Sequence, residues 1–342
     1  MRWITVPTPG MPRPSRTSIL NLESALGLVI ILLLAVFTSP RSASGDRIFL
    51  EVGNLTDILR QVSEIGIVAV GMTLVILTAG IDLSVGSTLA LAGSVLGLCF
   101  TAWSGLDSTE RILLALICAL AASALVGALN GFVIARLRIQ PFIVTLASMI
   151  GIRGLARRLT NNTNIDFGFG SDAASVFARI GSAKPVVVGS LAVVFVVFGV
   201  LLARTVFGRR VRAVGDNETA ALYAGLPIRR TKIYVYTWCG FLSGLAGVIH
   251  AAQNHQGNPN TGISYELEAI AAVVIGGASL AGGKGSIQGT LIGTLIMGVL
   301  TNMLRLNNVD SNTEMMLKAV IIIAAVWIQQ FNTAKFARGV AS

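Results

Sequence analysis

Residues 62–103 read VSEIGIVAVGMTLVILTAGIDLSVGSTLALAGSVLGLCFTAW, and this stretch decides the fold class. It contains two apolar runs separated at Asp82, and each approaches the roughly 20 residues that a helix needs to cross a bilayer. In lipid, such a run satisfies its own backbone hydrogen bonds only as a helix, because it lacks the alternation of a barrel strand. The stretch therefore predicts two membrane-spanning helices.

The composition extends this prediction to the whole chain. Of its 342 residues, 54% are hydrophobic and only 12% are charged, whereas a soluble domain has roughly 25% charged residues. We predict about ten spans: 20–37, 62–79, 83–103, 111–135, 141–158, 185–203, 233–253, 267–282, 287–305 and 314–331. They form one transmembrane domain over 20–331, between tails at 1–19 and 332–342. The first span is favoured as a retained anchor, with a signal peptide cleaved near Ser42 as the alternative. The fold class is an all-α polytopic membrane protein.

The basic residues predict the orientation. The chain has 26 Lys and Arg against 16 Asp and Glu. Seven of the basic residues flank one loop: Arg204, Arg209, Arg210, Arg212, Arg229, Arg230 and Lys232. Since Lys and Arg gather in cytoplasmic loops, we place this loop and both termini in the cytoplasm. No basic run is interleaved with aromatic residues, which argues against nucleic acid as a partner.

The stretch Gly71–Ser87 contains a predicted helix break. Gly80 can turn the chain, and Asp82 can cap the next helix by accepting from the backbone N–H of Ser84 or Val85. A carboxylate at the bilayer centre is costly, so Asp82 needs a partner or a place near an interface. The residues of this break are Gly80, Asp82, Ser84 and Gly86. A role of Asp82 in gating or ion coupling is the alternative.

The basic loop, over 208–231, contains a predicted helix of about two turns. Asp216 or Asn217 suits its N-cap, Gly225 its left-handed C-terminal position, and Pro227 stops it. So short a helix needs a surface to pack on, either a cleft in another protein or lipid headgroups. Its candidate contact residues are Gly215, Asp216, Asn217, Glu218, Ala220, Ala221, Leu222 and Gly225.

A third stretch, Tyr265–Ser286, is rich in glycine. A phosphate-binding loop is excluded, because Ala278 stands where its first glycine belongs and Gly285 where its Ser or Thr belongs. A hinge between two helices is the better interpretation. Its residues are Gly277, Gly282, Gly283, Lys284 and Gly285.

The sequence shows no pattern of residues typical of a catalytic site or a metal site. The two histidines, His250 and His255, are read as a span-end residue and a loop residue. The three cysteines are odd in number and far apart, so the sequence predicts neither a disulfide nor a zinc site. We therefore expect a protein that is not an enzyme and binds no metal or cofactor.

The three stretches, in this order, resemble the permease subunit of sugar-type ATP-binding-cassette importers, the ribose/xylose/galactose permease family. The resemblance covers roughly residues 60–330, and Gly215–Gly225 carries it most specifically. At Thr219 this loop differs mildly from the family pattern, which leads us to expect alanine there.

This resemblance implies a set of partners and a fold. A cytoplasmic ATP-binding subunit docks on a coupling helix, here residues 216–225, and binds the ATP that the permease does not. A periplasmic solute-binding protein delivers the solute, and a second permease copy or a paralogue completes the pathway. The fold would be similar to that of vitamin B12 and branched-chain amino acid permeases, in the bacterial inner membrane. The expected cargo is a monosaccharide; a nucleoside or a furanose signalling molecule is the alternative.

Four polar residues are candidates for the pathway lining: Asn130, Gln253, Asn254 and Asn302. Each can equally bond to a neighbouring helix. The rival function is an ion-coupled secondary transporter, which often places ionisable groups at midplane. The candidates for that role are Asp82, Glu64, Glu268 and Lys318, all of which we expect near span ends.

Overall fold

The structure, a computed structural model, describes residues 16–42, 45–102, 107–170, 172–321 and 323. The predicted tail 332–342 and most of the tail 1–19 lie outside the described residues. The described chain is mainly helical, and its helices are α1 (Arg16–Thr38), η1 (Ile48–Leu50), α2 (Val52–Leu77), α3 (Val85–Ala102), α4 (Ser108–Leu137), α5 (Pro141–Leu159), α6 (Ala173–Gly181), α7 (Lys184–Arg204), α8 (Val206–Asp216), α9 (Glu218–Tyr223), α10 (Ile228–Asn254), α11 (Tyr265–Ile275) and α12 (Ile287–Leu306). Residues 311–321 are also helical. Two short strands, β1 (Ile165–Asp166) and β2 (Gln256–Gly257), pair antiparallel.

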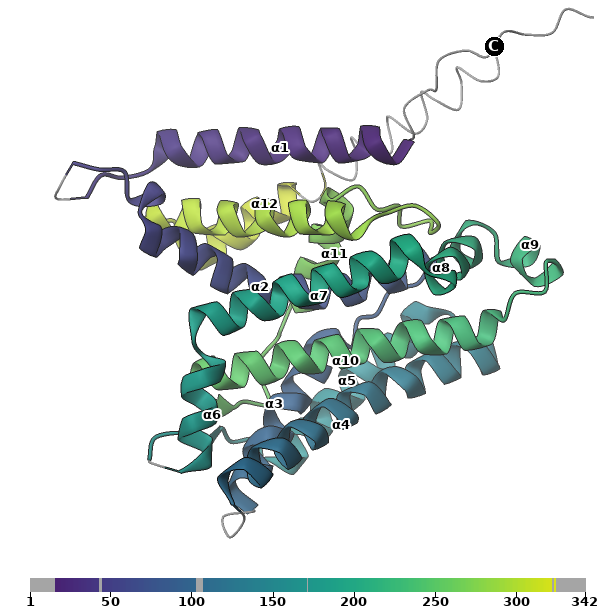
Figure 1. Cartoon of the computed structure of the whole chain (residues 1–342), viewed down its shortest axis with the longest axis horizontal. Helices are drawn as coiled ribbons and strands as arrows, with labels where there is room; N and C mark the ends of the chain where they lie inside the picture. The colour runs from purple at the N-terminus through teal and green to yellow at the C-terminus, as the bar shows by residue number, and fades with distance from the viewer. Residues whose placement is uncertain (1–15, 43–44, 103–106, 171, 322, 324–342) are drawn as a thin grey trace, which may run out of the picture.

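The long helices lie side by side, running across the page in Figure 1. One end of the bundle, which we call the α9 end, holds α8, α9 and the loop between α11 and α12. The other end, the α6 end, holds α6 and the segment after α5 (Figure 1).

The centre of the bundle is α2. Every residue from Gly66 to Leu77 is buried, on all sides of this helix. A helix that is apolar all round belongs inside a protein, and α2 contacts α7, α10, α11 and α12. Its position makes α2 the element that connects the two ends of the molecule.

Small residues allow α4 and α10 to approach closely. A Cβ on Gly127 would overlap the backbone of Tyr236, and one on Gly240 would overlap the backbone of Ser123. Close backbone contact is how helices pack where lipid supplies no hydrophobic drive between them. Gly127 and Gly240 therefore pack within the bundle, against the backbone of the neighbouring helix.

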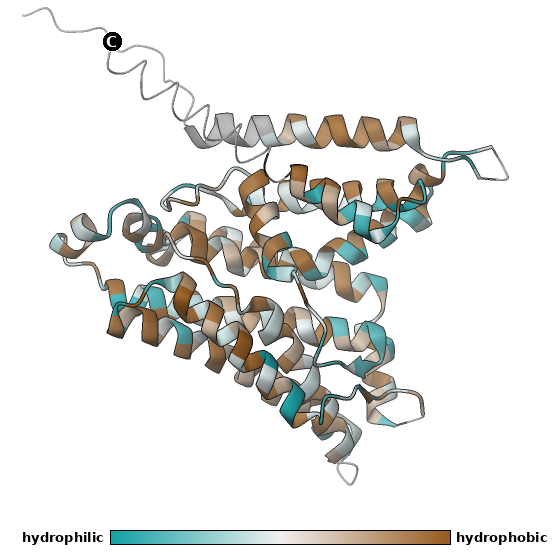
Figure 2. Cartoon of the chain, turned by 180° about the vertical axis from the view of Figure 1, so that it is seen from behind, coloured by the Kyte–Doolittle hydropathy of each residue, from teal (hydrophilic) through white to brown (hydrophobic). Residues whose placement is uncertain are grey.

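Apolar side chains also cover much of the outer surface. Six described helices are long and apolar enough to cross a membrane: α2, α3, α4, α7, α10 and α12. On α4 and α7 the outward side chains are apolar: Leu113, Leu114, Ile117, Leu125, Leu129, Val193, Val196, Val197 and Val200 are all at least 41% exposed. Figure 2 shows the long helices mostly brown or pale. So large an apolar surface requires lipid, and the chain is an all-α polytopic membrane protein.

The structure corrects two of the predicted spans, and a third lies partly outside the described residues. The predicted span 267–282 is not a single helix, because α11 ends at Ile275 and residues 276–286 are irregular. At 1.5 Å per residue, the 11 residues of α11 cover about 17 Å, well short of the ~30 Å hydrocarbon core. The predicted span 62–79 begins too late, since α2 starts at Val52. Of 314–331, only the part to residue 321 and residue 323 are described.

Candidate functional site

The three sequence motifs meet at the α9 end. The carbonyl oxygen of Leu77, the last residue of α2, accepts the N–H of Gly283 at 3.0 Å. Gly215 of α8 lies so close to the same carbonyl that a Cβ at this position would overlap it. Gly283 has a φ of +72°, which glycine adopts without strain. One carbonyl group therefore joins the end of α2, the glycine-rich loop and the basic loop.

The predicted helix break lies beside this junction. Asp82 is 1% exposed, and its Oδ1 accepts the backbone N–H of Ser84 at 2.9 Å and the Ser84 hydroxyl at 2.6 Å. The amide of Asn130, on α4, donates to the Ser84 hydroxyl oxygen at 2.9 Å. The hydrogen bond that the cap prediction invokes is present. Asp82 lies in a chain of polar groups that fastens the segment between α2 and α3 to α4.

The basic loop has more helix than the sequence predicts. Gly215 and Asp216, expected in or beside one short helix, close a separate helix, α8, which sequence reasoning missed. The following α9 has six residues, and the side chain of Asn217 caps it by accepting the N–H of Ala220 at 2.9 Å. Gly225 follows with a φ of +74°. The basic loop is therefore a pair of helices with a sharp corner at Asn217.

One side of α9 is fastened to the bundle and the other is free. Ala221 is buried in an apolar cluster with Val214, Leu226 and Ile228. The Lys232 ammonium pairs with the Glu218 carboxylate at 2.7 Å. On the outer side, Leu222 is 60% exposed and Tyr223 is 87% exposed. In Figure 1, α9 projects beyond the long helices.

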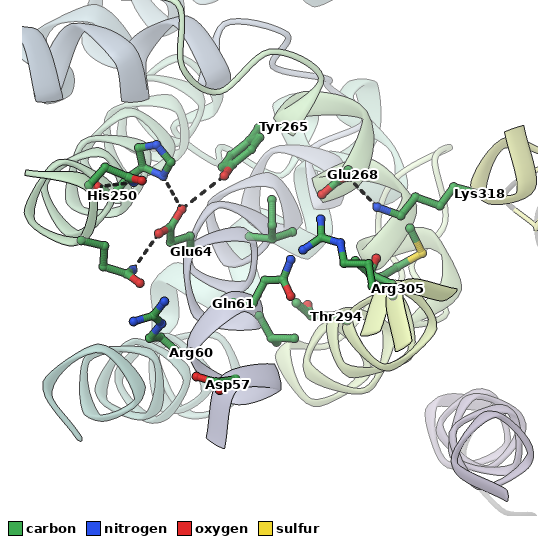
Figure 3. Close-up of a pocket in the computed structure, with 17 residues that line it drawn as sticks. Asp57, Arg60, Gln61, Glu64, His250, Tyr265, Glu268, Thr294, Arg305 and Lys318 are labelled. Carbon is green, nitrogen blue, oxygen red and sulfur yellow. Dashed lines mark hydrogen bonds and ion pairs between the residues drawn. The ribbon is translucent and has the colours of Figure 1, made fainter. Parts of the chain in front are cut away.

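A second feature is a cavity of about 460 Å³ nearer the α6 end. It lies among α2, α10, α11, α12 and the helix over 311–321, and Figure 3 shows the polar side chains that point into it. The lining residues are Asp57, Arg60, Gln61, Val62, Glu64, Ile65, His250, Gln253, Asn254, Tyr265, Glu268, Thr294, Met297, Gly298, Thr301, Arg305 and Lys318.

Glu64 is the centre of the hydrogen bonding in the cavity. Its Oε2 contacts Nδ1 of His250 at 2.7 Å and accepts the Tyr265 hydroxyl at 3.2 Å. Its Oε1 accepts the Gln253 amide at 2.7 Å. The other ring nitrogen of His250 meets the Thr261 hydroxyl at 2.7 Å. Figure 3 shows His250 of α10 and Tyr265 of α11 converging on Glu64.

The cavity wall also contains ion pairs. Lys318 contacts Glu268 at 3.0 Å and Glu314 at 2.7 Å, and Arg305 contacts Glu314 at 3.4 Å. These contacts join α11 and α12 to the helix over 311–321. Much of the charge at this cavity is therefore neutralised by neighbouring protein groups.

The structure separates the four candidate pathway residues into two pairs. Gln253 and Asn254 line the cavity. Asn130 lies beside Asp82, and Asn302 exchanges hydrogen bonds with Asn54 at 2.8 and 3.2 Å. The amides of this second pair thus bond to neighbouring segments, as the sequence analysis allowed.

The sequence did not predict that these residues line one cavity. Glu64, which we expect near a span end, lies inside the longer helix α2, where twelve helical residues precede it. His250, read as a span-end residue, lies four residues before the end of α10 and pairs with Glu64. An ionisable residue within an apolar run was the available signal. Within the described residues, no three His, Cys, Asp or Glu side chains form a group suited to a metal ion.

Comparison with known proteins identifies the family. The family model described as the branched-chain amino acid transport system / permease component matches residues 54–326. This range contains the three motifs and every residue that lines the cavity. The chain belongs to this permease family.

The permease is also similar to named sugar permeases along most of its length. It is 42% identical over 310 residues to the ribose import permease protein of Escherichia coli (strain K12), covering 90% of this chain and 92% of the relative. It is 37% identical over 329 residues to the L-arabinose ABC transporter permease protein of Azospirillum brasilense, covering 94% and 92%. It is 32% identical over 369 residues to the xylose transport system permease protein of Escherichia coli (strain K12), covering 90% and 92%. No solved structure matches the permease. Its apolar helices and its relatives place it in the bacterial inner membrane.

Proposed function

We propose that this permease is the membrane subunit of an ATP-driven importer of a monosaccharide. Its relatives are named for ribose, arabinose and xylose, and the similarity covers about nine-tenths of this chain. The structural observation that carries the proposal is the junction at Leu77, where α2, the glycine-rich loop and the α8–α9 pair share one carbonyl group. Such a junction can transmit a push on α9 to the centre of the bundle.

The proposed topology places the α9 end in the cytoplasm. The seven basic residues that flank α8 and α9 support this orientation, with both termini inside. The transmembrane domain covers 20–331, with the coupling loop at 208–231 and tails at 1–19 and 332–342. Six spans are the long apolar helices, and α1, α5, the α11 segment and the helix that begins at residue 311 bring the total to about ten.

The proposed mechanism needs partners on both sides of the membrane. A cytoplasmic ATP-binding subunit, which binds the ATP, docks on the exposed side of α9. A periplasmic solute-binding protein delivers the sugar at the α6 end, and a second permease copy or a paralogue completes the pathway. Nucleotide shifts the permease between access states only if the ATPase grips α9 differently in the two states.

Within this mechanism each motif has a proposed task. Residues 215–225 receive the force from the ATP-binding subunit. Leu222 and Tyr223 contact that subunit, and Ala221 anchors α9 to the bundle. The turn over Gly277–Gly285 lets α11 and α12 change their relative position. The polar segment over Gly80–Gly86 holds α3 and α4 in place while α2 moves.

Docking is tested by placing charges on the free side of α9. In Leu222→Asp/Tyr223→Asp, the apolar contact is lost while the buried Ala221 cluster stays intact. Since a central apolar contact contributes at least ~2 kcal/mol, we expect co-purification of the proposed ATP-binding subunit to fall at least tenfold. Sugar uptake should fall with it.

The matched control is Phe169→Asp, which charges another strongly exposed aromatic residue, at the α6 end. This variant should retain the ATP-binding protein, and both variants should melt in detergent at the temperature of the parent. Undiminished co-purification of the ATP-binding protein with the double variant would contradict the proposed docking surface.

A further inference from the structure

The cavity around Glu64 has the chemistry of a binding site for a neutral polyhydroxylated solute. Its wall contains three carboxylates, Asp57, Glu64 and Glu268, against three permanent cations, Arg60, Arg305 and Lys318. Several of these groups are paired within the protein: Lys318 with Glu268, Lys184 with Asp57, and Arg305 with Glu314. Because the positive and negative charges of this wall balance, it favours a neutral ligand over an ion of either sign.

The size of the cavity suits a small solute. Its volume of about 460 Å³ lies toward the lower end of the roughly 300–1,000 Å³ typical of small-molecule sites. Residues with hydrogen-bonding side chains stand beside one aromatic residue, Tyr265, and a few apolar groups such as Met297. This mixture matches a sugar ring, which presents hydroxyl groups at its edge and C–H groups on its faces.

Glu64 retains the capacity to bind a ligand. An ionised carboxylate has about four acceptor sites, and three are used by His250, Gln253 and Tyr265. The Gln253 amide donates one of its two N–H groups to Glu64 and also carries an acceptor oxygen. Since these partners come from α10 and α11, they fix the carboxylate in place before any ligand enters.

The cavity is connected to the α9 end by two elements. Glu64 precedes Leu77 by thirteen residues of continuous helix, about 20 Å. Tyr265 and Glu268 begin α11, whose other end continues into the glycine-rich turn that bonds to Leu77. A shift at the junction therefore moves the Glu64 side of the cavity relative to the Tyr265 side.

We propose that this cavity is the monosaccharide site of the permease, with Glu64 and Gln253 binding sugar hydroxyl groups and Tyr265 contacting the ring. The assignment rests on the proposed function, and it adds the place, the residues and the neutral polyol class of the ligand. Displacement of α2 relative to α11 opens and closes the site as α9 is pushed.

The first test separates sugar transfer from ATPase coupling. The permease is reconstituted in liposomes with its ATP-binding subunit and solute-binding protein, and uptake of radiolabelled ribose, arabinose and xylose is measured together with ATP hydrolysis. For Glu64→Gln and Gln253→Ala we expect about tenfold less sugar per ATP hydrolysed, because hydrogen bonds to the sugar are weakened. Hydrolysis stimulated by the solute-binding protein should stay within about twofold of the parent, since the α9 end is intact.

The controls are Glu110→Gln and Gln288→Ala, which change the same residue types at exposed positions outside the cavity. Both should keep the parental ratio of sugar to ATP. Parental ratios in Glu64→Gln and Gln253→Ala would overturn the cavity assignment. A parent complex that imports none of the three sugars with ATP would instead contradict the proposed function.

A second measurement detects the ligand directly and does not depend on transport. Asn254→Cys places a thiol at the cavity wall, and Asn162→Cys places one in an exposed loop outside it. The parent gives the labelling background, because Cys99 and Cys239 are buried and Cys118 is partly buried. Excess sugar should slow reaction of a membrane-impermeant maleimide with Asn254→Cys and leave Asn162→Cys unchanged. Equal labelling of Asn254→Cys with and without each of the three sugars would overturn the assignment.

Discussion

At the scale of single residues, Asp82 shows how a carboxylate can be accommodated between two membrane helices. It lies at a break in the helical path, where backbone N–H groups lack helical partners and need an acceptor. The Ser84 N–H and hydroxyl supply two hydrogen bonds to one carboxylate oxygen, and Asn130 extends the chain of polar groups to α4. The geometry favours a structural role for Asp82 over ion coupling.

Substitution of Asp82 separates these two roles. Asp82→Asn keeps an acceptor oxygen for Ser84, so we expect a melting temperature close to that of the parent and substantial sugar uptake. Asp82→Leu leaves buried donors unsatisfied, at about 1–3 kcal/mol each, and should lower the melting temperature and the yield of folded protein. Melting in detergent and uptake at two pH values measure both effects. An Asn variant that folds but loses uptake in a proton-dependent manner would show that Asp82 couples ions.

Single residues also show where sequence reasoning is effective. The Asn217 cap and the left-handed Gly225 follow from neighbours within a few positions, and the structure contains both. The Glu64 cluster was not predicted, because its partners lie 186 to 201 positions away along the chain. Which residues meet across three helices depends on helix packing, and a residue pattern alone does not determine it.

At the scale of helices, the closest packing in the bundle depends on the absence of side chains. The α4–α10 contact places Gly127 against the Tyr236 backbone and Gly240 against the Ser123 backbone. By contrast, a Cβ at Gly189 on α7 would meet nothing within 4 Å. The two positions allow the same substitution to be compared in a tight contact and in an open one.

We expect Gly127→Ala to destabilise the permease and Gly189→Ala to leave it unchanged or slightly more stable. The added methyl group at position 127 forces the two helices apart, at a typical cost of about 1–3 kcal/mol. At position 189 alanine only favours the helix. The midpoint of thermal unfolding in detergent measures both variants. Equal midpoints for the two variants would mean that α4 and α10 do not pack through these glycines.

The helix boundaries show a second limit of the sequence. Hydrophobicity located most spans, but it merged α11 with the apolar residues of the following turn and began α2 ten residues late. In the first case Gly276 and Gly277 end the helix inside an apolar run. In the second, the polar start of α2 continues the helix beyond the apolar run. Apolar length is therefore a poor guide to helix length wherever a helix is broken or extends past the membrane.

At the scale of the whole molecule, the two functional regions lie at different depths of one bundle. The exposed side of α9 is at one end, the cavity around Glu64 is nearer the other, and α2 passes through both regions. Composition alone predicted the membrane class, and the three motifs predicted the family. The connection between the two functional regions was not predicted, because Leu77, Gly215 and Gly283 become neighbours only in the folded chain.

Accumulation of sugar in liposomes tests whether this chain is a passive conduit driven by a separate ATPase. Purified permease is reconstituted with and without its ATP-binding subunit and solute-binding protein, and uptake of radiolabelled ribose, arabinose and xylose is followed with ionophores that dissipate proton and sodium gradients. We predict uphill accumulation of at least one of these sugars that requires both partners and ATP and survives the ionophores. Accumulation by the permease alone, driven by an ion gradient and abolished by the ionophores, would contradict the account.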